Sequence, residues 1–260
     1  MIATAIAIGL GVGLVVGGLG GGGSVLTVPA LVFLLGEPPH SAATASLVIV
    51  GVSSVFGLFA RARAGQVHWL YGLSFGAIGM LTAVGGTVLS RRLNPNVLLL
   101  AFAVLILLAA FSLFRRTPEP AAAPPGTEPS RSGLARVTRS IKIVLAGSVA
   151  GLATGLFGVG GGFLVVPALV VVLGWPMPIA VGTSLLVIMI NSVASLSVRV
   201  ATDSFHWSVI IPVTLAAVIG TLLGKKITDQ VSSTFLSRAF ATLLVAVAAY
   251  TATRSVIALG

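Results

Sequence analysis

Cysteine is absent from the 260 residues, and acidic side chains are scarce, with five aspartates and glutamates in all. The lack of cysteine excludes disulfides, thiolate catalysis and cysteine-based metal sites. Charged residues make up only 8% of the chain, whereas a soluble domain carries about 25%. Because 57% of the residues are hydrophobic, the composition excludes a soluble enzyme, a disordered chain and a nucleic-acid-binding module.

Long apolar stretches predict an all-α, polytopic membrane protein. At about 20 residues per span, the chain length allows roughly eight to ten membrane segments and little mass outside the bilayer. The N-terminal stretch is interpreted as a retained first helix, since no basic residues precede it as they would in a signal peptide. The apolar stretches lie at about residues 2–17, 24–36, 41–60, 68–90, 96–114, 141–157, 163–174, 179–200, 206–224 and 233–257.

A segment rich in proline, alanine and arginine divides the chain. Residues 115–139 read RRTPEPAAAPPGTEPSRSGLARVTR and lack apolar periodicity, which predicts a flexible, basic cytoplasmic linker. We therefore expect one transmembrane repeat at 1–114 and a second at 140–260. The net charge of +10 then indicates topology rather than polyanion binding, because basic residues accumulate in cytoplasmic segments.

The two halves carry an internal repeat at an offset of 138 residues. Residues 20–49 and 158–187 are identical at 15 of 30 positions without a gap. The same register matches Arg61 to Arg199, and after a four-residue gap GTVLSRR matches GTLLGKK. Two matched halves, each with a short segment interrupted by glycine and proline, are typical of secondary transporters.

Two topologies are compatible with this repeat. If all five segments of each half cross the membrane, the halves are inverted and both termini face away from the linker, which is the arrangement we favour. If the short segments at 24–36 and 163–174 are re-entrant, each half has four crossings and the halves are parallel. Those segments are broken or re-entrant in either case, since at 1.5 Å per residue they reach roughly 18–20 Å, less than a hydrocarbon core of about 30 Å.

Clustered glycines precede each short segment. Glycine lets the backbone turn sharply, and the helix that follows directs free N–H groups and the positive end of its dipole at a ligand. Two such helix ends facing each other near the midplane would bind an anion, although the glycines also suit close helix packing. The candidate site residues are Gly22, Gly23, Ser24, Gly160, Gly161 and Gly162, with Pro29 and Pro167 as structural hinges.

Uncharged and cationic side chains near these turns are further candidates for holding an anion. Hydroxyl and amide donors would coordinate an oxyanion without carrying charge, although a membrane serine also bonds back to its own helix. An arginine fork suits an oxyanion, and at a helix end it equally suits an interfacial anchor. The further candidates are Ser46, Thr183, Ser184, Asn191, Arg61 and Arg199.

Other chemistry is not expected from this sequence. No acidic residue falls in the middle of a long apolar stretch, so we do not expect a buried carboxylate relay for protons or sodium. Three histidines without cysteine predict no metal site. The nucleophile-elbow and P-loop motifs are absent as well, so the sequence predicts neither an enzyme nor a cofactor, and nucleic acid is not an expected partner.

The doubled motif resembles the signature of the TauE/SafE sulfite exporter family. The likeness is carried by GGLGGGGSVLTVPALVFLLGEPPHSAATASL in the first half and TGLFGVGGGFLVVPALVVVLGWPMPIAVGTSL in the second. The resemblance implies a multi-pass inner-membrane transporter of sulfite, organosulfonates such as sulfoacetate, or related small sulfur anions. Its motifs point to Gly22, Gly23, Pro29, Ser46, Gly160, Gly161, Pro167, Thr183 and Ser184. Because Gly182 stands where the first half has Thr44, the halves should not contribute equally to a site.

We therefore expect an exporter of such anions that works by alternating access. Its expected partners are a small anionic substrate and membrane lipid, and the sequence leaves open a homo-oligomer. Two other functions also stay open. One is an anion channel with no conformational cycle, and the other is a membrane-embedded accessory subunit of a sulfur-metabolism complex.

Overall fold

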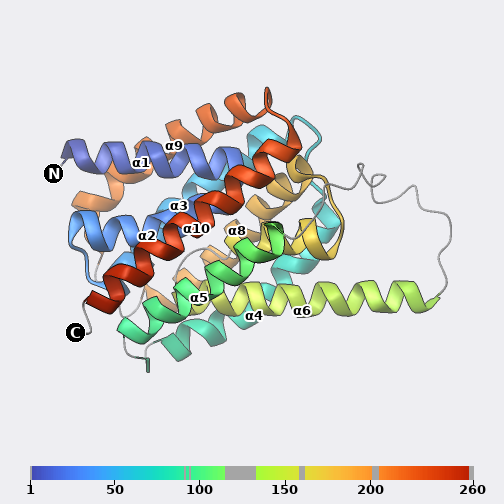
Figure 1. Ribbon diagram of the computed structural model, residues 1–260, viewed down its shortest axis with the longest axis horizontal. Coiled ribbons are helices and arrows are strands. Elements are labelled where there is room, and N and C mark those ends of the chain that lie inside the picture. Colours follow the sequence, from blue (N-terminus) through green and yellow to red (C-terminus); the bar gives the residue numbers. More distant parts are fainter. Residues whose placement is uncertain are drawn as a thin grey trace.

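The computed structural model describes residues 2–90, 92–93, 95–114, 133–157, 162–200 and 205–257. Over these ranges the chain forms ten α-helices, one π-helical stretch and no strand (Figure 1). The first half contains α1 (Ile2–Leu19), α2 (Gly22–Leu35), α3 (Pro39–Ala62), α4 (Trp69–Ser90) and α5 (Pro95–Phe114). The second half contains α6 (Gly133–Phe157), α7 (Gly162–Pro167), the π-helix η1 (Ala168–Val172), α8 (Met177–Arg199), α9 (Trp207–Thr228) and α10 (Ser233–Ile257).

The expected all-α polytopic membrane protein is confirmed. Among the described helices, α3, α4, α8 and α9 are each long and apolar enough to cross a membrane. The linker is shorter than expected, because residues 133–139 already belong to α6. This stretch follows the last proline of the segment and contains good helix formers such as leucine, alanine and arginine. Residues 115–132 lie outside the described part of the chain.

The short segments predicted after the glycine clusters are short helices. Helix α2 has 14 residues, so it is about 21 Å long and does not span a hydrocarbon core of about 30 Å by itself. Its counterpart is divided into the 6-residue α7 and the 5-residue η1. Pro29 lies inside α2, and Pro167 ends α7 where the π-helix begins. Proline removes one backbone hydrogen bond of the helix, so a change of helix type at Pro167 is physically reasonable.

Helices α3 and α8 pair with each other and run antiparallel. Arg199, at the end of α8, reaches Thr44 near the start of α3, and Gly57 near the end of α3 lies against Leu185 near the start of α8. Since α3 and α8 occupy equivalent positions in the repeat, their antiparallel course means that the two halves are inverted. In agreement, α1 begins and α10 ends at one end of the molecule, whereas α6 begins at the other (Figure 1).

The first helix of each half packs along the fourth helix of the other half. Helix α1 runs parallel to α9, where Gly13 lies against the backbone of Ala217. Helix α6 runs parallel to α4, where Gly151 lies against the backbone of Gly79. A Cβ atom at either position would overlap the neighbouring main chain, so glycine permits an approach that no other residue allows.

These contacts keep the 138-residue register without a gap. Gly13 is equivalent to Gly151, and Ala217 is equivalent to Gly79. At the ends of the fourth helices, Ser90 is equivalent to Thr228. The gapped match of GTVLSRR to GTLLGKK is therefore wrong as a structural alignment. It paired similar residues of α4 and α9 that lie one helical turn apart.

Substitution of Gly13 by alanine tests the packing of α1 on α9. We expect Gly13→Ala to lower the melting temperature, because overpacking of a tight contact costs about 1–3 kcal/mol. Gly11 on the same helix has no neighbouring atom within 4 Å. Gly11→Ala should therefore leave the melting temperature unchanged or raise it, since alanine favours a helix by about 1 kcal/mol over glycine. Thermal unfolding in detergent, followed by circular dichroism, compares the two, and equal melting temperatures would contradict the packing.

Candidate functional site

The turn between α1 and α2 is the described part of the predicted glycine site. Gly20 has a φ angle of +68°, which glycine adopts without strain, and α2 begins at Gly22. A Cβ atom at Gly20 would lie 2.7 Å from the hydroxyl oxygen of Ser184 and 3.3 Å from a methyl carbon of Val166. The structure thus brings this turn together with Ser184 of the other half.

The remaining glycine candidates have separate explanations or are not described. A Cβ atom at Gly23 would lie 2.6 Å from the carbonyl oxygen of Val12 in α1, so this glycine allows α1 and α2 to pack closely. Gly162 is the first residue of α7. Gly160, Gly161 and the side chain of Ser24 lie outside the described part of the structure.

Arg61 and Arg199 are buried, with 2% of each residue exposed, and each binds the C-terminal end of a helix. Nη2 of Arg61 donates to the carbonyl oxygens of Gly17 and Gly18 at 2.7 and 3.2 Å. Nη2 of Arg199 donates to the carbonyl oxygen of Gly155 at 3.0 Å. The last carbonyls of a helix lack partners within it, and a cation is favourable at that end of the helix dipole. Both arginines therefore stabilise the ends of first helices.

Each arginine also reaches the fourth helix of the other half. Nη2 of Arg61 lies 3.5 Å from Oγ1 of Thr228, and Nη2 of Arg199 lies 3.2 Å from Oγ of Ser90. Each guanidinium therefore ties three helices together. The two arginines lie at opposite ends of the α3–α8 pair, since the stretch of α3 from Thr44 to Arg61 is about 26 Å long. They do not share a ligand.

The difference between Thr44 and Gly182 changes how the two arginines are bound. Nη1 of Arg199 donates to Oγ1 of Thr44 at 3.3 Å. Gly182 has no hydroxyl group for the equivalent contact, and Nη1 of Arg61 instead donates to Oε1 of Gln66 at 2.8 Å. This asymmetry of the repeat therefore has a structural explanation at the arginines.

The two short helices do not direct their N-termini at each other at the midplane. Because Arg61 binds Gly17 and Gly18, the turn before α2 lies level with the end of α3. Inversion places the end of α6, where Arg199 binds Gly155, at the opposite end of the α3–α8 pair, and α7 runs away from that end until Val166 meets Gly20. The expected single site between facing helix ends is therefore corrected to two separate helix ends, because α2 and α7 run past each other in opposite directions.

Polar side chains without hydrogen-bond partners in the described structure lie between the two arginines. They are the hydroxyl groups of Ser54 on α3 and of Ser192 and Ser195 on α8, together with the whole carboxamide of Asn191. We call these four residues the central polar cluster. Each is at most 2% exposed. A buried donor or acceptor left unsatisfied costs about 1–3 kcal/mol, so four such residues near the middle of two paired helices require an explanation.

Asn191 faces α4 at a glycine. A Cβ atom at Gly79 would lie 2.8 Å from both Nδ2 and Oδ1 of Asn191, so glycine at this position lets the amide pack against the backbone of α4. The equivalent residue of the first half is Ser53, whose hydroxyl donates to the carbonyl oxygen of Ile49 at 2.6 Å. The two halves therefore differ at this position, since Ser53 is satisfied by its own helix and Asn191 is not.

The hydroxyl groups predicted as anion ligands at Ser46, Thr183 and Ser184 are already hydrogen-bonded. Ser46 and Ser184 donate to carbonyl oxygens of their own helices at 3.1 and 2.8 Å. Thr183 accepts a hydrogen bond from the backbone N–H of His68 at 3.0 Å. These side chains still offer oxygen lone pairs, but the donors that an anion needs are more available in the central polar cluster.

Asn191 was among the candidates predicted from the sequence, whereas the three serines of the central polar cluster were not. A signal for two of them was present, because Ser53 and Ser54 match Asn191 and Ser192 in the repeat. Adjacent polar residues at matched positions of two apolar helices are expensive in a membrane and mark functional positions.

Loop contacts close the two ends of the molecule in different ways. At the end where α1 begins, Nδ1 of His206 lies 2.8 Å from a carboxylate oxygen of Glu37. At the end where α6 begins, the rings of His68 and Trp175 are 5.0 Å apart between centroids. His206 is the repeat equivalent of His68, and Trp175 that of Glu37. Each contact joins the two halves.

The role of the buried arginines is tested by neutral substitution. Arg61→Gln and Arg199→Gln should each lower the melting temperature, because hydrogen bonds to a charged group contribute about 1.5–3 kcal/mol. Arg63 is exposed and lies two residues beyond Arg61, so Arg63→Gln should change the melting temperature little. Thermal unfolding of the three variants makes the comparison. A similar effect of Arg61→Gln and Arg63→Gln would contradict the assignment.

Comparison with known proteins agrees with this architecture. The family described as sulfite exporter TauE/SafE matches residues 5–251. A probable membrane transporter protein of Xylella fastidiosa (strain Temecula1 / ATCC 700964) is 31% identical over 247 residues, which cover 94% of this chain and 92% of that protein. The probable membrane transporter protein YdhB of Bacillus subtilis (strain 168) is 26% identical over 246 residues, which cover 89% of this chain and 95% of that protein. No solved structure matches the chain. The chain therefore belongs to the sulfite exporter TauE/SafE family of membrane transporters.

Proposed function

We propose that the protein is a secondary transporter that exports a small sulfur oxyanion across the inner membrane by alternating access. Sulfite and organosulfonates such as sulfoacetate are the proposed substrates. The central polar cluster is the observation that carries this proposal, because it places neutral donors without partners near the middle of the α3–α8 pair. In transporters with inverted repeats, the substrate site lies near the midplane at the interface of the repeats.

The chemistry of the cluster suits an oxyanion. The carboxamide of Asn191 offers two N–H donors, and each serine offers one hydroxyl donor. Hydrogen bonds to a charged acceptor are roughly twice as strong as those between neutral groups. An arriving anion would therefore offset the cost of the unsatisfied donors, while the absence of a cation among the four residues allows the anion to leave again.

The charges of the described spans also favour an anion. Arg61 and Arg199 place a buried positive charge at each end of the α3–α8 pair. The described acidic residues, Glu37 and Asp229, lie outside the helices, before α3 and after α9. Charges in a surrounding of low dielectric act over long distances. Anions are therefore attracted toward the central polar cluster, and cations are repelled.

Export of an anion needs no separate energy source in a cell that is negative inside. The membrane potential favours the outward movement of one negative charge by about 2.3 kcal/mol per 100 mV. A transporter that only alternates between two open states is therefore sufficient. This agrees with the described spans, in which no acidic residue lies near the central polar cluster.

Alternating access requires that each end of the pathway open in turn. The contacts of Glu37 with His206 and of His68 with Trp175 both join one half to the other, at opposite ends of the molecule. Movement of the halves against each other would separate one contact while the other holds. The two loop contacts therefore serve as the gates in this proposal.

The proposal is tested by substituting Asn191 and its repeat equivalent. Asn191→Leu should reduce counterflow of radiolabelled sulfite in proteoliposomes by about ten-fold or more, because a hydrogen bond to a charged group contributes about 1.5–3 kcal/mol. The same change should leave the melting temperature unchanged or raise it, since it removes an unsatisfied amide. Ser53→Ala is the matched control, and its transport should be close to that of the parent, because Ser53 bonds within its own helix.

Three results would contradict the proposal. Counterflow no higher than in empty vesicles for sulfite, thiosulfate and organosulfonates would exclude transport of these anions. A flux that does not saturate with substrate would indicate a channel. Full activity of Asn191→Leu would show that the central polar cluster does not bind the substrate.

A further inference from the structure

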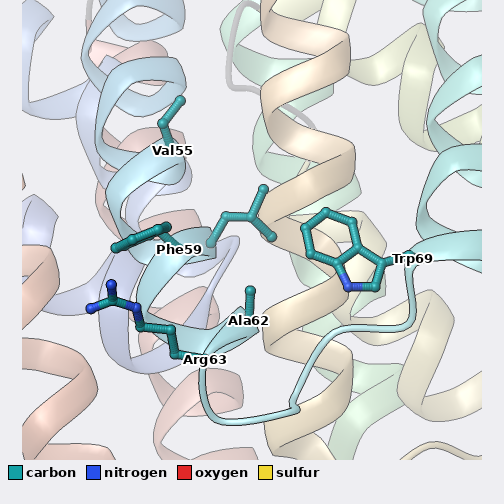
Figure 2. A pocket seen from close by; sticks show the side chains of 6 residues that line it. Val55, Phe59, Ala62, Arg63 and Trp69 are labelled. Atoms are coloured by element: carbon teal, nitrogen blue, oxygen red, sulfur yellow. The ribbon is translucent and has the colours of Figure 1, made fainter.

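A groove opens between α3 and α4 on the outer surface of the helix bundle (Figure 2). It has a volume of about 390 Å³ and is lined by Val55, Leu58, Phe59, Ala62, Arg63 and Trp69. Leu58 is buried, whereas Val55, Phe59 and Trp69 are 45%, 59% and 51% exposed. Trp69 lies across the groove from α3, the side chains of Phe59 and Arg63 extend away from Trp69 in this view, and the loop that joins α3 to α4 closes one end (Figure 2). Five of the six lining residues are apolar, so the groove suits a hydrocarbon chain.

A single cation lies at the rim of this groove. The guanidinium of Arg63 is 4.3 Å from the centroid of the Phe59 ring, a distance at which cation–π attraction holds the charge in place. Unlike Arg61, Arg63 is exposed. The groove therefore combines an apolar trough with a fixed positive charge at the end of a membrane-spanning helix, where a phospholipid carries its phosphate.

The repeat shows that this combination belongs to one half of the protein. Trp69 is matched by Trp207 at the other end of the molecule, whereas Phe59 is matched by Ser197 and Arg63 by Ala201. The helix surface and its interfacial tryptophan are thus common to both halves. The cation and the ring that holds it are found in the first half alone.

The charge of this end of the molecule identifies the leaflet. Arg63 follows α3, and Lys225 and Lys226 lie in the last turn of α9, which runs parallel to α3. Helix α6 also begins at this end (Figure 1), and its N-terminal part contains Arg136, Arg139 and Lys142. Basic residues mark the cytoplasmic side of membrane proteins, and the cytoplasmic leaflet is the one with a negative surface.

We propose that this groove binds an anionic phospholipid of the cytoplasmic leaflet. One acyl chain lies between α3 and Trp69, and the headgroup phosphate pairs with the guanidinium of Arg63. A guanidinium matches phosphate oxygens in geometry as well as charge. The site requires only that the chain be inserted in a membrane, so it is independent of the anion that the protein transports.

Quenching of tryptophan fluorescence by brominated lipids tests the site with a matched control inside the chain. Trp207→Phe leaves Trp69 as the exposed reporter, and Trp69→Phe leaves Trp207 in the equivalent position. Trp175, which is 4% exposed, contributes the same background to both variants. Each variant is placed in vesicles that contain equal amounts of phosphatidylglycerol and phosphatidylcholine, with bromine on the acyl chains of one lipid at a time.

We expect the quenching of Trp69 to give a binding ratio of phosphatidylglycerol to phosphatidylcholine of about five. This is the effect of one arginine near an anionic surface. This binding ratio should fall to about one in Arg63→Gln, and it should decrease toward one in high salt. Trp207 should show no preference. Equal quenching of Trp69 by both lipids would overturn the proposal and indicate an ordinary lipid-facing surface. A preference that survives Arg63→Gln would overturn the role of Arg63.

Discussion

Contact between bare backbones, α1 on α9 and α4 on α6, is the constraint on which the remaining structure depends. Lipid tails are as apolar as leucine, so the hydrophobic effect does not hold helices together inside a bilayer. Close approach and dispersion must supply the attraction instead, and these require glycine at the points of contact. Because each contact joins the first helix of one half to the fourth helix of the other, neither half is completely packed without its partner.

The packing of each first helix on the fourth helix of the other half also determines where polar groups are placed. With the four outer helices locked in two parallel pairs, α3 and α8 are held between them and bury their polar residues against each other and against α4 and α9. Arg61 and Arg199 fasten the ends of the same arrangement, since each binds a first helix and a fourth helix together. The molecule thus has two similar ends, each with a buried arginine that is hydrogen-bonded to a first helix and a fourth helix. Between them lies one centre, where four polar side chains have no partner in the described structure.

Much of the fold was predictable from the sequence because apolar stretches and an ungapped repeat are properties of the chain itself. Most helix boundaries, the short helices after the glycine clusters and the equivalence of Arg61 and Arg199 in the repeat follow from those patterns, whereas the start of α6 at Gly133 did not. The position of the glycine turns along the α3–α8 pair could not be predicted from those patterns, because it depends on the direction in which each half is packed. The gapped match near the ends of α4 and α9 failed for a similar reason, since residue similarity outweighed the contacts that fix the register.

The candidate site was less predictable, and neighbouring residues show why. Ser53 and Ser54 are identical in type and adjacent in the chain, yet Ser53 donates to its own helix and Ser54 has no partner in the described structure. Only the position of the surrounding helices distinguishes them. Likewise, Gly20 and Gly23 belong to one glycine cluster, but Gly20 meets Ser184 of the other half, whereas Gly23 meets α1 of its own half.

The loops break the symmetry that the helices preserve. A carboxylate and an imidazole meet at one face of the protein, and an indole and an imidazole meet at the opposite face. In a perfectly symmetric pair of inverted copies, the inward-open and outward-open conformations would be mirror alternatives of equal free energy. If the protein works by the proposed alternating access, the interactions broken on opening differ between the faces, so the empty carrier would have a preferred resting orientation and its two half-cycles would proceed at different rates.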